Sequence, residues 1–228
     1  ILVAIPAFNE EKTIGEIIVE IRKEYREFSP TIIVVDDGSS DDTARIAKEK
    51  GAVVVEHQAN EGVARTTNTA LEESQKYDKD ILVMMDADGQ HIVGEIRKII
   101  KPILAGEADI VIGSRFLKEY ANMPSMNLFG NRLLSFLVSV LIGKRITDAQ
   151  SGFRAMRGEF SENMKIESRF TYTQEMILRA AHGKYRIVEV PINVKTRRYG
   201  KSRVVSYWFI YMVKVSRDVV QYYLRRWI

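Results

Sequence analysis

The chain has 228 residues, 46% of them apolar and 28% charged, which suits one α/β domain with a substantial core and excludes a mainly disordered protein. It has no cysteine, so disulfides and thiolate metal sites are excluded. The net charge of +4 is unevenly spread, because the opening third is acidic and residues 195–226 are strongly basic. This asymmetry predicts anionic partners near the C-terminal end. No aromatic-basic RNA motif or recognition-helix pattern accompanies it, so we do not expect nucleic acid as a partner.

Short β-branched runs alternate with helical patterns through the first half of the chain. This rhythm predicts an α/β fold with a Rossmann-like, mostly parallel sheet whose strands are joined by crossover helices. The expected strands are residues 2–5, 32–35, 53–55, 81–85, 110–112 and 187–190. Helices are expected around Ile14 to Ile21, after Glu95 as far as Leu104, and at residues 127–142 and 173–182. Gly51 and Gly106 have the position of helix stops.

The last 25 residues, 204–228, form a helical pattern that mixes aromatic residues with lysine and arginine. Such an amphipathic helix is typical of a membrane interface, and we favour that interpretation. The alternative is that its aromatic side chains pack on the domain while its cations are solvated. The longest apolar stretch, residues 133–142, is much shorter than the roughly 20 residues that cross a bilayer, and we expect no secretory leader.

Polar residues follow the first two strands, at the sheet edge where parallel sheets bind ligands. After the first strand, Asn9 is expected to cap the next helix. After the second strand, Asp36 and Asp37 carry carboxylates that can accept hydrogen bonds from a base or a ribose hydroxyl, while Asp41 and Asp42 are expected to cap a helix.

Two acids one residue apart follow the fourth strand, in the sequence Asp86-Ala87-Asp88-Gly89-Gln90-His91. Their carboxylates repel each other unless a cation lies between them or one takes a proton. Oxygen ligands suit Mg²⁺ or Mn²⁺, and we expect Asp88 and the amide oxygen of Gln90 to supply the protein's share. The alternative is a turn followed by a helix cap.

At this point the sequence resembles the family 2 glycosyltransferases of the GT-A fold, and most of all the dolichol-phosphate or polyprenyl-phosphate mannose synthases. The resemblance lies in six ordered stretches: IPAFNEE at 5–11, VVDDGSSD at 34–41, DADGQH at 86–91, GSRF at 113–116, DAQSGFR at 148–154 and YGKS at 199–202. Two loops depart from the family pattern, at Ile92-Val93 and at residues 63–65.

The resemblance implies a set of site residues. The nucleoside would be held by Pro6, Ala7, Phe8, Glu10, Val35, Asp36 and Asp37. Asp86, Ala87 and Asp88 would meet the diphosphate, with Asp86, Asp88 and Gln90 as ligands of Mg²⁺ or Mn²⁺. Arg115 would contact phosphate, and Arg198, Lys201 and Arg203 would lie on a basic loop that closes over the diphosphate.

A lipid phosphate is already anionic at neutral pH, so it needs positioning cations rather than a base. On the helix at 127–142, Arg132 and Ser135 are expected on one face as acceptor residues, so the catalytic set is Asp88, Arg115, Arg132 and Ser135. Apolar residues of this helix, Leu133, Leu134, Phe136, Leu137, Val140 and Leu141, are expected beside an isoprenoid tail. An ordinary buried helix with a solvated arginine is the alternative.

The resulting hypothesis is a catalytic domain at 1–203 followed by a membrane-interface helix at 204–228, on the cytoplasmic face of a membrane. The enzyme would move one sugar, mannose from GDP-mannose as the first choice, to a polyprenyl or dolichyl phosphate by a single inverting displacement. UDP-glucose is the rival donor. Two other interpretations stay open: transfer to a saccharide or protein hydroxyl, with Asp148 as base, and a noncatalytic nucleotide-binding module that recruits partners to membranes.

Overall fold

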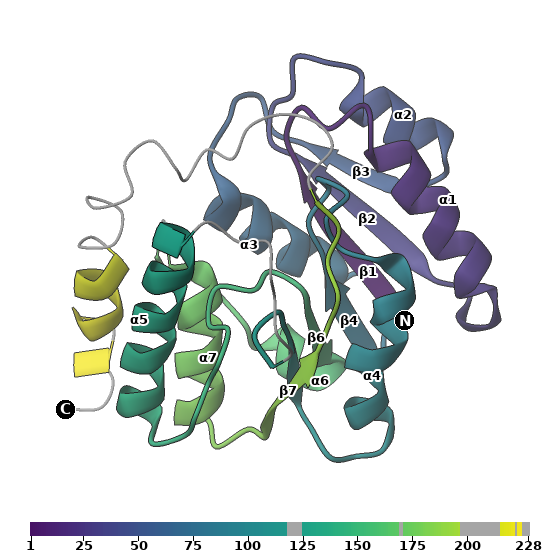
Figure 1. Ribbon diagram of the computed structural model, residues 1–228. Helices are drawn as coiled ribbons and strands as arrows, with labels where there is room; N and C mark the ends of the chain where they lie inside the picture. Colours follow the sequence, from purple (N-terminus) through teal and green to yellow (C-terminus); the bar gives the residue numbers. More distant parts are fainter. Residues whose placement is uncertain (118–124, 169–170, 197–214, 222, 225–228) are drawn as a thin grey trace.

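A seven-stranded sheet forms the centre of the molecule, with strand order β3-β2-β1-β4-β6-β5-β7 (Figure 1). The computed structural model describes residues 1–117, 125–168, 171–196, 215–221 and 223–224, and the side chains of these ranges except residues 125–127. The strands are β1 (Leu2–Ala7), β2 (Thr31–Asp36), β3 (Val53–Glu56), β4 (Ile81–Met84), β5 (Ile110–Ser114), β6 (Arg154–Arg157) and β7 (Ile187–Pro191). All neighbouring pairs are parallel except those that β6 makes with β4 and β5.

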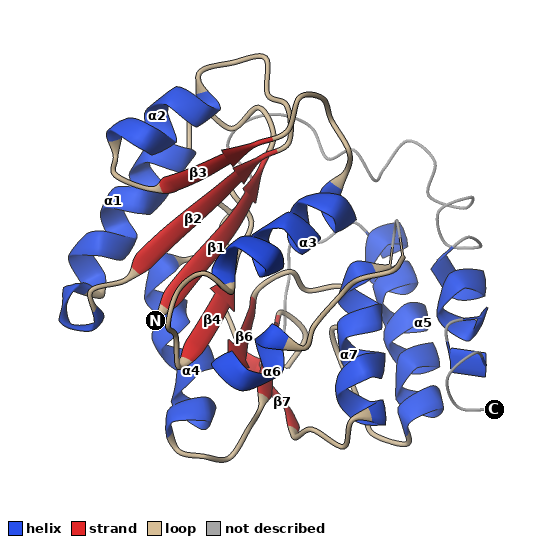
Figure 2. Cartoon of the chain, turned by 180° about the vertical axis from the view of Figure 1, so that it is seen from behind, coloured by secondary structure: helices blue, strands red, loops and turns tan. Residues whose placement is uncertain are grey.

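Helices cover both faces of the sheet (Figure 2). The α-helices are α1 (Ile14–Glu24), α2 (Thr43–Glu49), α3 (Val63–Ser74), α4 (Ile96–Leu104), α5 (Ser125–Ile142), α6 (Gly158–Glu162) and α7 (Tyr172–His182). Two short 3₁₀ helices, Arg26–Phe28 and Val93–Glu95, lie between them. The α/β fold with a mostly parallel sheet is therefore confirmed.

Side chains alternate across β1 and so divide the core into two layers. Leu2 and Ala4 join the cluster that contains residues of α3, α5, α6 and α7, whereas Val3 and Ile5 join the cluster that contains residues of α1, α2 and α4. All four are at most 1% exposed, so the strand is buried on both faces. This burial explains why the strand reads as a continuous apolar run.

The predicted strands, and the predicted helices before residue 204, are confirmed to within three residues at their ends, but α3, β6 and α6 were missed. In β6 only Ala155 and Met156 are apolar, because an arginine stands at each end of the strand. Arg154 is nevertheless 1% exposed, and its guanidinium donates to the carbonyl oxygens of Ala149, Ser151 and Thr173 at 2.5–3.1 Å. These three bonds explain how a cation can be buried in a central strand. Burial also lowers the pKa of Arg154 to about 10.

The described part of the C-terminal segment is helical at 215–221 and 223–224 and packs on the domain. Val215 and Val219 are buried in the core cluster that includes α5, and Tyr223 packs against it. The remaining aromatic residues of the predicted interface helix, Tyr207, Trp208, Phe209, Tyr211, Tyr222 and Trp227, lie outside the described residues. Among the helices that the structure describes, none combines the length and apolar character needed to cross a bilayer.

Gly158, which follows β6, provides a test of this architecture. A Cβ at this residue would lie 1.9 Å from the carbonyl oxygen of Lys79, just ahead of β4. We expect Gly158→Ala to lower the free energy of unfolding by about 1–3 kcal/mol, because backbone must move to relieve the overlap. Urea denaturation measures this. Gly94→Ala is the control, since its Cβ meets only the flexible Glu24 side chain at 3.3 Å. Equal stability of the two variants would contradict the predicted contact.

Candidate functional site

Hydrogen bonds between the loops that follow β1, β2 and β4 hold these strand ends together. The amide of Asn9 donates to the Oγ of Ser39, and the amide of Ser40 donates to the Oδ1 of Asn9, both at 2.8 Å. Thr13 donates its hydroxyl to the carbonyl oxygen of Ala87 at 2.6 Å. The prediction that Asn9 caps α1 is therefore wrong: Thr13 occupies the N-cap position, and the Asn9 side chain bonds to the neighbouring loop. Asn9 adopts φ 56°, a conformation that asparagine tolerates better than most residues.

Most residues predicted to hold the nucleoside are neighbours in space. The β1–β2 pairing places Pro6 beside Val35 and Ala7 beside Asp36. Phe8 and Glu10 follow β1 and are half-buried. The structure thus gathers these residues at one edge of the sheet, and their contact with a nucleoside stays a prediction.

Both carboxylates after β2 are buried and have partners within the protein. Asp36 accepts hydrogen bonds from the hydroxyl and the amide of Ser39, and burial raises the pKa of its carboxyl. Asp37 accepts from the amides of Glu61 and Gly62 at 3.0 and 2.9 Å and lies 2.8 Å from Nδ1 of His57. Asp37 therefore anchors the loop at 57–62, a structural role that the sequence motif did not reveal.

Both aspartates before α2 were predicted to cap this helix, and they differ in what they bind. Asp41 accepts the amide of Thr43, the first residue of α2, at 3.0 Å. Asp42 occupies the N-cap position without a side-chain cap, and its carboxylate pairs with Arg45 instead. Capping is thus confirmed for Asp41 and wrong for Asp42.

The loop after β4, residues 86–91, is called the acidic loop here, and short-range hydrogen bonds determine its shape. Oδ1 of Asp88 accepts the amide of Gln90 at 3.0 Å. The amide of Asp86 donates to Nδ1 of His91 at 3.1 Å, so the proton of the neutral imidazole is on Nε2, which lies 3.8 Å from Oδ2 of Asp86. His91 stacks on Phe153 with 4.8 Å between ring centroids. Burial lowers the pKa of His91 to about 4, so the ring is neutral at pH 7.

Gly152 lies directly beneath the Asp86 carboxylate. A Cβ at this residue would lie 3.0 Å from both carboxylate oxygens and 3.2 Å from the hydroxyl of Tyr172. The missing side chain therefore leaves space next to both the Asp86 carboxylate, which is 43% exposed, and the Tyr172 hydroxyl. Sequence reasoning missed Tyr172, because it is the first residue of a helix distant in sequence from the acidic loop.

Arg115, directly after β5, is held by Asp148. Oδ2 of Asp148 accepts the Arg115 amide at 3.0 Å and its Nε at 2.7 Å, and Oδ1 accepts Nη2 at 2.8 Å. Asp148 is fully buried, whereas the Arg115 side chain is 22% exposed. The bidentate geometry fixes the plane of the guanidinium. Asp148, Asp88 and Arg115 all act electrostatically on His91, so this pair belongs to the same site as the acidic loop.

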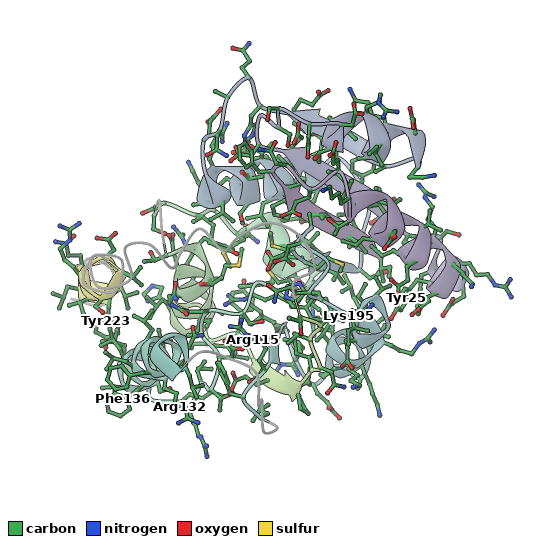
Figure 3. The ribbon with its side chains drawn as sticks, turned by 45° about the horizontal axis from the view of Figure 1, so that its top comes forward. Tyr25, Arg115, Arg132, Phe136, Lys195 and Tyr223 are labelled. Atoms are coloured by element: carbon green, nitrogen blue, oxygen red, sulfur yellow. The ribbon has the colours of Figure 1, made fainter. Side chains whose placement is uncertain are left out.

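Arg132 and Ser135, predicted on one face of α5, are placed in different environments. Arg132 is exposed on the outer side of α5 with Phe136, away from Arg115 (Figure 3). Ser135 is 3% exposed, and its Oγ accepts the amide of Ala149 at 3.0 Å. The prediction that both residues lie on one face is therefore wrong, because Ser135 turns toward the core. A catalytic role for either residue stays a prediction. The prediction that Leu134 lies beside a lipid tail is also wrong, since this residue is completely buried in the core.

The chain after β7 runs along the acidic loop. The amide of Lys195 donates to the carbonyl oxygen of Gln90 at 2.8 Å, and Val194 forms an antiparallel bridge with His91. The exposed Lys195 is therefore brought to the acidic loop (Figure 3). Arg198, Lys201 and Arg203, predicted to close over a diphosphate, follow this segment and lie outside the described residues.

The acidic loop fits a hard divalent cation whose remaining ligands come from a second molecule. Its donors are carboxylate and amide oxygens, and Gly152 leaves room beside the Asp86 carboxylate. Within the part of the chain that the structure describes, no three His, Asp or Glu side chains converge to hold an ion by themselves. An ion here would therefore need oxygens from a second molecule, as Mg²⁺ usually does at phosphate sites.

Comparisons with known proteins point to one family. Residues 2–164 match the sequence profile "Glycosyl transferase family 2". The UDP-N-acetylglucosamine–dolichyl-phosphate N-acetylglucosaminyltransferase of Methanococcus voltae is 34% identical, over 89% of this chain and 88% of its own. The polyprenol monophosphomannose synthase of Mycolicibacterium smegmatis is 28% identical, over 89% and 80%. Glucosyl-3-phosphoglycerate synthase of Mycobacterium tuberculosis, solved with Mn²⁺, UDP and phosphoglyceric acid, shares the fold, with a TM-score of 0.74, 21% identity and coverage of 99% and 77%.

A second aspartate–arginine pair has the same pattern of hydrogen bonds as Arg115–Asp148 and makes a controlled test possible. At the opposite end of β5, Asp109 accepts the amide, Nε and Nη2 of Arg186 at 2.8–3.1 Å. Because Arg186 is half exposed, we expect Asp109→Asn to cost about 1 kcal/mol of stability. Asp148→Asn should lower the free energy of unfolding by about 3 kcal/mol, because Asp148 is fully buried.

Only Asp148→Asn should weaken binding of a Mn²⁺–nucleoside diphosphate, by tenfold or more, because only this change releases Arg115. Calorimetric titration of both folded variants measures the difference. Equal affinities in the two variants would show that the orientation of Arg115 does not matter for the diphosphate.

Proposed function

Because this chain belongs to glycosyl transferase family 2, we propose that it moves one sugar from a nucleotide-sugar to a polyprenyl or dolichyl phosphate at a membrane surface. Mannose from GDP-mannose is the first choice of donor, and Mg²⁺ or Mn²⁺ is the proposed cofactor. The reaction is a single displacement that inverts the configuration at the sugar carbon.

The preference for a phosphate acceptor rests on three carboxylates outside the acidic loop, of which Asp148 and Glu175 are buried and Glu189 is half-buried. Asp148 is paired with Arg115, and Glu189 accepts the amides of Thr147 and Asp148. The third, Glu175, accepts backbone amides and pairs with Arg179 at 2.8 Å. A hydroxyl acceptor requires a positioned base, and none of these three carboxylates is placed to serve as one. A phosphate acceptor requires no base, so this arrangement favours it over transfer to a saccharide or protein hydroxyl.

The donor end combines the acidic loop with cations. When a sugar leaves a nucleoside diphosphate, negative charge grows on the diphosphate, and a divalent cation bound at Asp86 and Asp88 would stabilise it. Arg115 is fixed in one plane by Asp148, and in this proposal its guanidinium donates to a phosphate oxygen. Lys195 leads the basic segment toward the same loop. This combination of metal ligands and cations favours catalysis over a noncatalytic nucleotide-binding module.

The membrane assignment is supported by the outer face of α5. Phe129, Leu133, Phe136 and Val140 are 46–67% exposed and follow helical spacing. A groove of about 550 Å³ lies between α5 and the helix at 215–221, lined by residues that include Leu133, Phe136 and Val220. Apolar surface of this kind suits acyl or isoprenoid chains. Absence of cysteine is compatible with a reducing compartment, in keeping with the cytoplasmic face.

A UDP-sugar is the second candidate donor. The relative from Methanococcus voltae is named for UDP-N-acetylglucosamine, whereas the one from Mycolicibacterium smegmatis is named for mannose. Both names include a polyprenol or dolichyl acceptor, so the two relatives agree on the kind of acceptor and differ in the sugar. UDP-glucose, the rival donor suggested by the sequence, belongs to the same test.

The test offers each labelled donor, GDP-mannose, UDP-glucose and UDP-N-acetylglucosamine, with Mn²⁺ and a short polyprenyl phosphate. Label is expected in the lipid phase from GDP-mannose, with an inverted anomeric centre, and should be lost on chelation. Asp88→Asn should lower turnover by about a hundredfold or more, while Asp42→Asn, which changes an exposed acid paired with Arg45, should not.

Three outcomes would contradict parts of this proposal. Label that enters the lipid phase from a UDP-sugar alone would contradict GDP-mannose as the donor. Equal transfer to the corresponding polyprenol would contradict the phosphate acceptor. A retained anomeric configuration would contradict the single displacement.

A further inference from the structure

Glu189, in β7, lies behind the Arg115–Asp148 pair and is connected to it by hydrogen bonds. Its Oε2 accepts the amide of Thr147 at 2.8 Å and the hydroxyl of Thr147 at 3.1 Å, and its Oε1 accepts the amide of Asp148 at 2.9 Å. Both oxygens of one carboxylate are thus used to fix two successive peptide units. The backbone of Asp148 is held in one position as a result.

The same network reaches Arg115 by a second route. Glu189 pairs with Ile112 in the parallel β5–β7 ladder, two residues before the end of β5. The Oγ of Ser114, the last residue of β5, lies 2.7 Å from the Oγ1 of Thr147, and it accepts the amide of Phe116 at 3.2 Å. The residues on both sides of Arg115 are therefore connected to the loop that Glu189 holds.

We propose that Glu189 is a positioning residue, which sets the guanidinium of Arg115 against the donor diphosphate by fixing the peptide units at 147–148. This inference rests on the proposed function, in which Arg115 contacts that diphosphate. Glu189 itself does not contact the substrate, and it acts through Asp148.

The chemistry of the contact requires a carboxylate. Two backbone N–H groups and one hydroxyl donate to Glu189, and a carboxylate offers acceptors only. A glutamine of the same size has one acceptor oxygen, so its NH₂ group would face a backbone N–H. The peptide at 147 or 148 must then move away, and the Asp148 carboxylate would carry the Arg115 side chain with it.

The experiment is a double-mutant cycle of Glu189→Gln and Arg115→Ala on the full chain, read as kcat/KM for sugar transfer to polyprenyl phosphate. Arg115→Ala should lower kcat/KM about a hundredfold. Glu189→Gln should lower it about tenfold in the parent and less than twofold in the Arg115→Ala background, because the positioned group is then absent. Asp109→Asn is the matched control, which removes a carboxylate that accepts a backbone amide at the far end of β5, and should leave kcat/KM within twofold.

The outcomes separate this inference from the proposed function. An Arg115→Ala variant with parental kcat/KM would overturn the proposed contact of Arg115 with the diphosphate, and this inference with it. A tenfold effect of Glu189→Gln that persists in the Arg115→Ala background would overturn the inference alone, because a purely structural contribution does not depend on Arg115.

A milder variant keeps the test decisive if Glu189→Gln does not fold. Thr147→Val removes only the hydroxyl that donates to Glu189 and bonds to Ser114. We expect it to lower kcat/KM about threefold in the parent and not at all in the Arg115→Ala background. An equal decrease in both backgrounds would contradict the positioning role.

Discussion

Two carboxylates, Asp86 and Asp88, stand one residue apart at the end of a buried strand, and their mutual repulsion is the constraint from which the rest of the site follows. The neighbouring imidazole does not neutralise them, because burial keeps His91 uncharged at pH 7. Gly152 keeps the space beside Asp86 clear of a side chain. The loop is thus arranged to receive positive charge, and an ion together with a diphosphate is the partner whose chemistry fits it.

Two arginines of the site have partners within the protein. Asp148 neutralises and orients Arg115, and Arg154 is satisfied by three carbonyl oxygens. Because the acids deeper in the fold are used in this way, they serve to position cations and backbone rather than to accept a proton. A fold organised in this manner suits an acceptor that arrives already negatively charged.

Much of this architecture could be predicted from the sequence. The buried strands read as apolar runs, and Gly51 and Gly106 end their helices with the positive φ angles that glycine allows. Sequence reasoning failed where a tertiary contact overrides local pattern. The β6 strand is hidden by its arginines, Asn9 bonds to a loop 31 residues away instead of capping α1, and Ser135 turns inward to bind the amide of Ala149. Neither the Asp148–Arg115 pair nor the position of Gly152 next to Asp86 and Tyr172 can be predicted from residue spacing, since each brings together residues far apart in the chain.

The central claim is that a cation at the acidic loop stabilises the charge of the departing nucleoside diphosphate. The most direct measurement is a crystal structure of the enzyme soaked with Mn²⁺ and a nucleoside diphosphate, with anomalous data collected near the manganese edge. The account predicts one anomalous peak within about 2.5 Å of a carboxylate oxygen of Asp88 or Asp86, bridged to the diphosphate. A diphosphate bound with its manganese at another place on the molecule would contradict it.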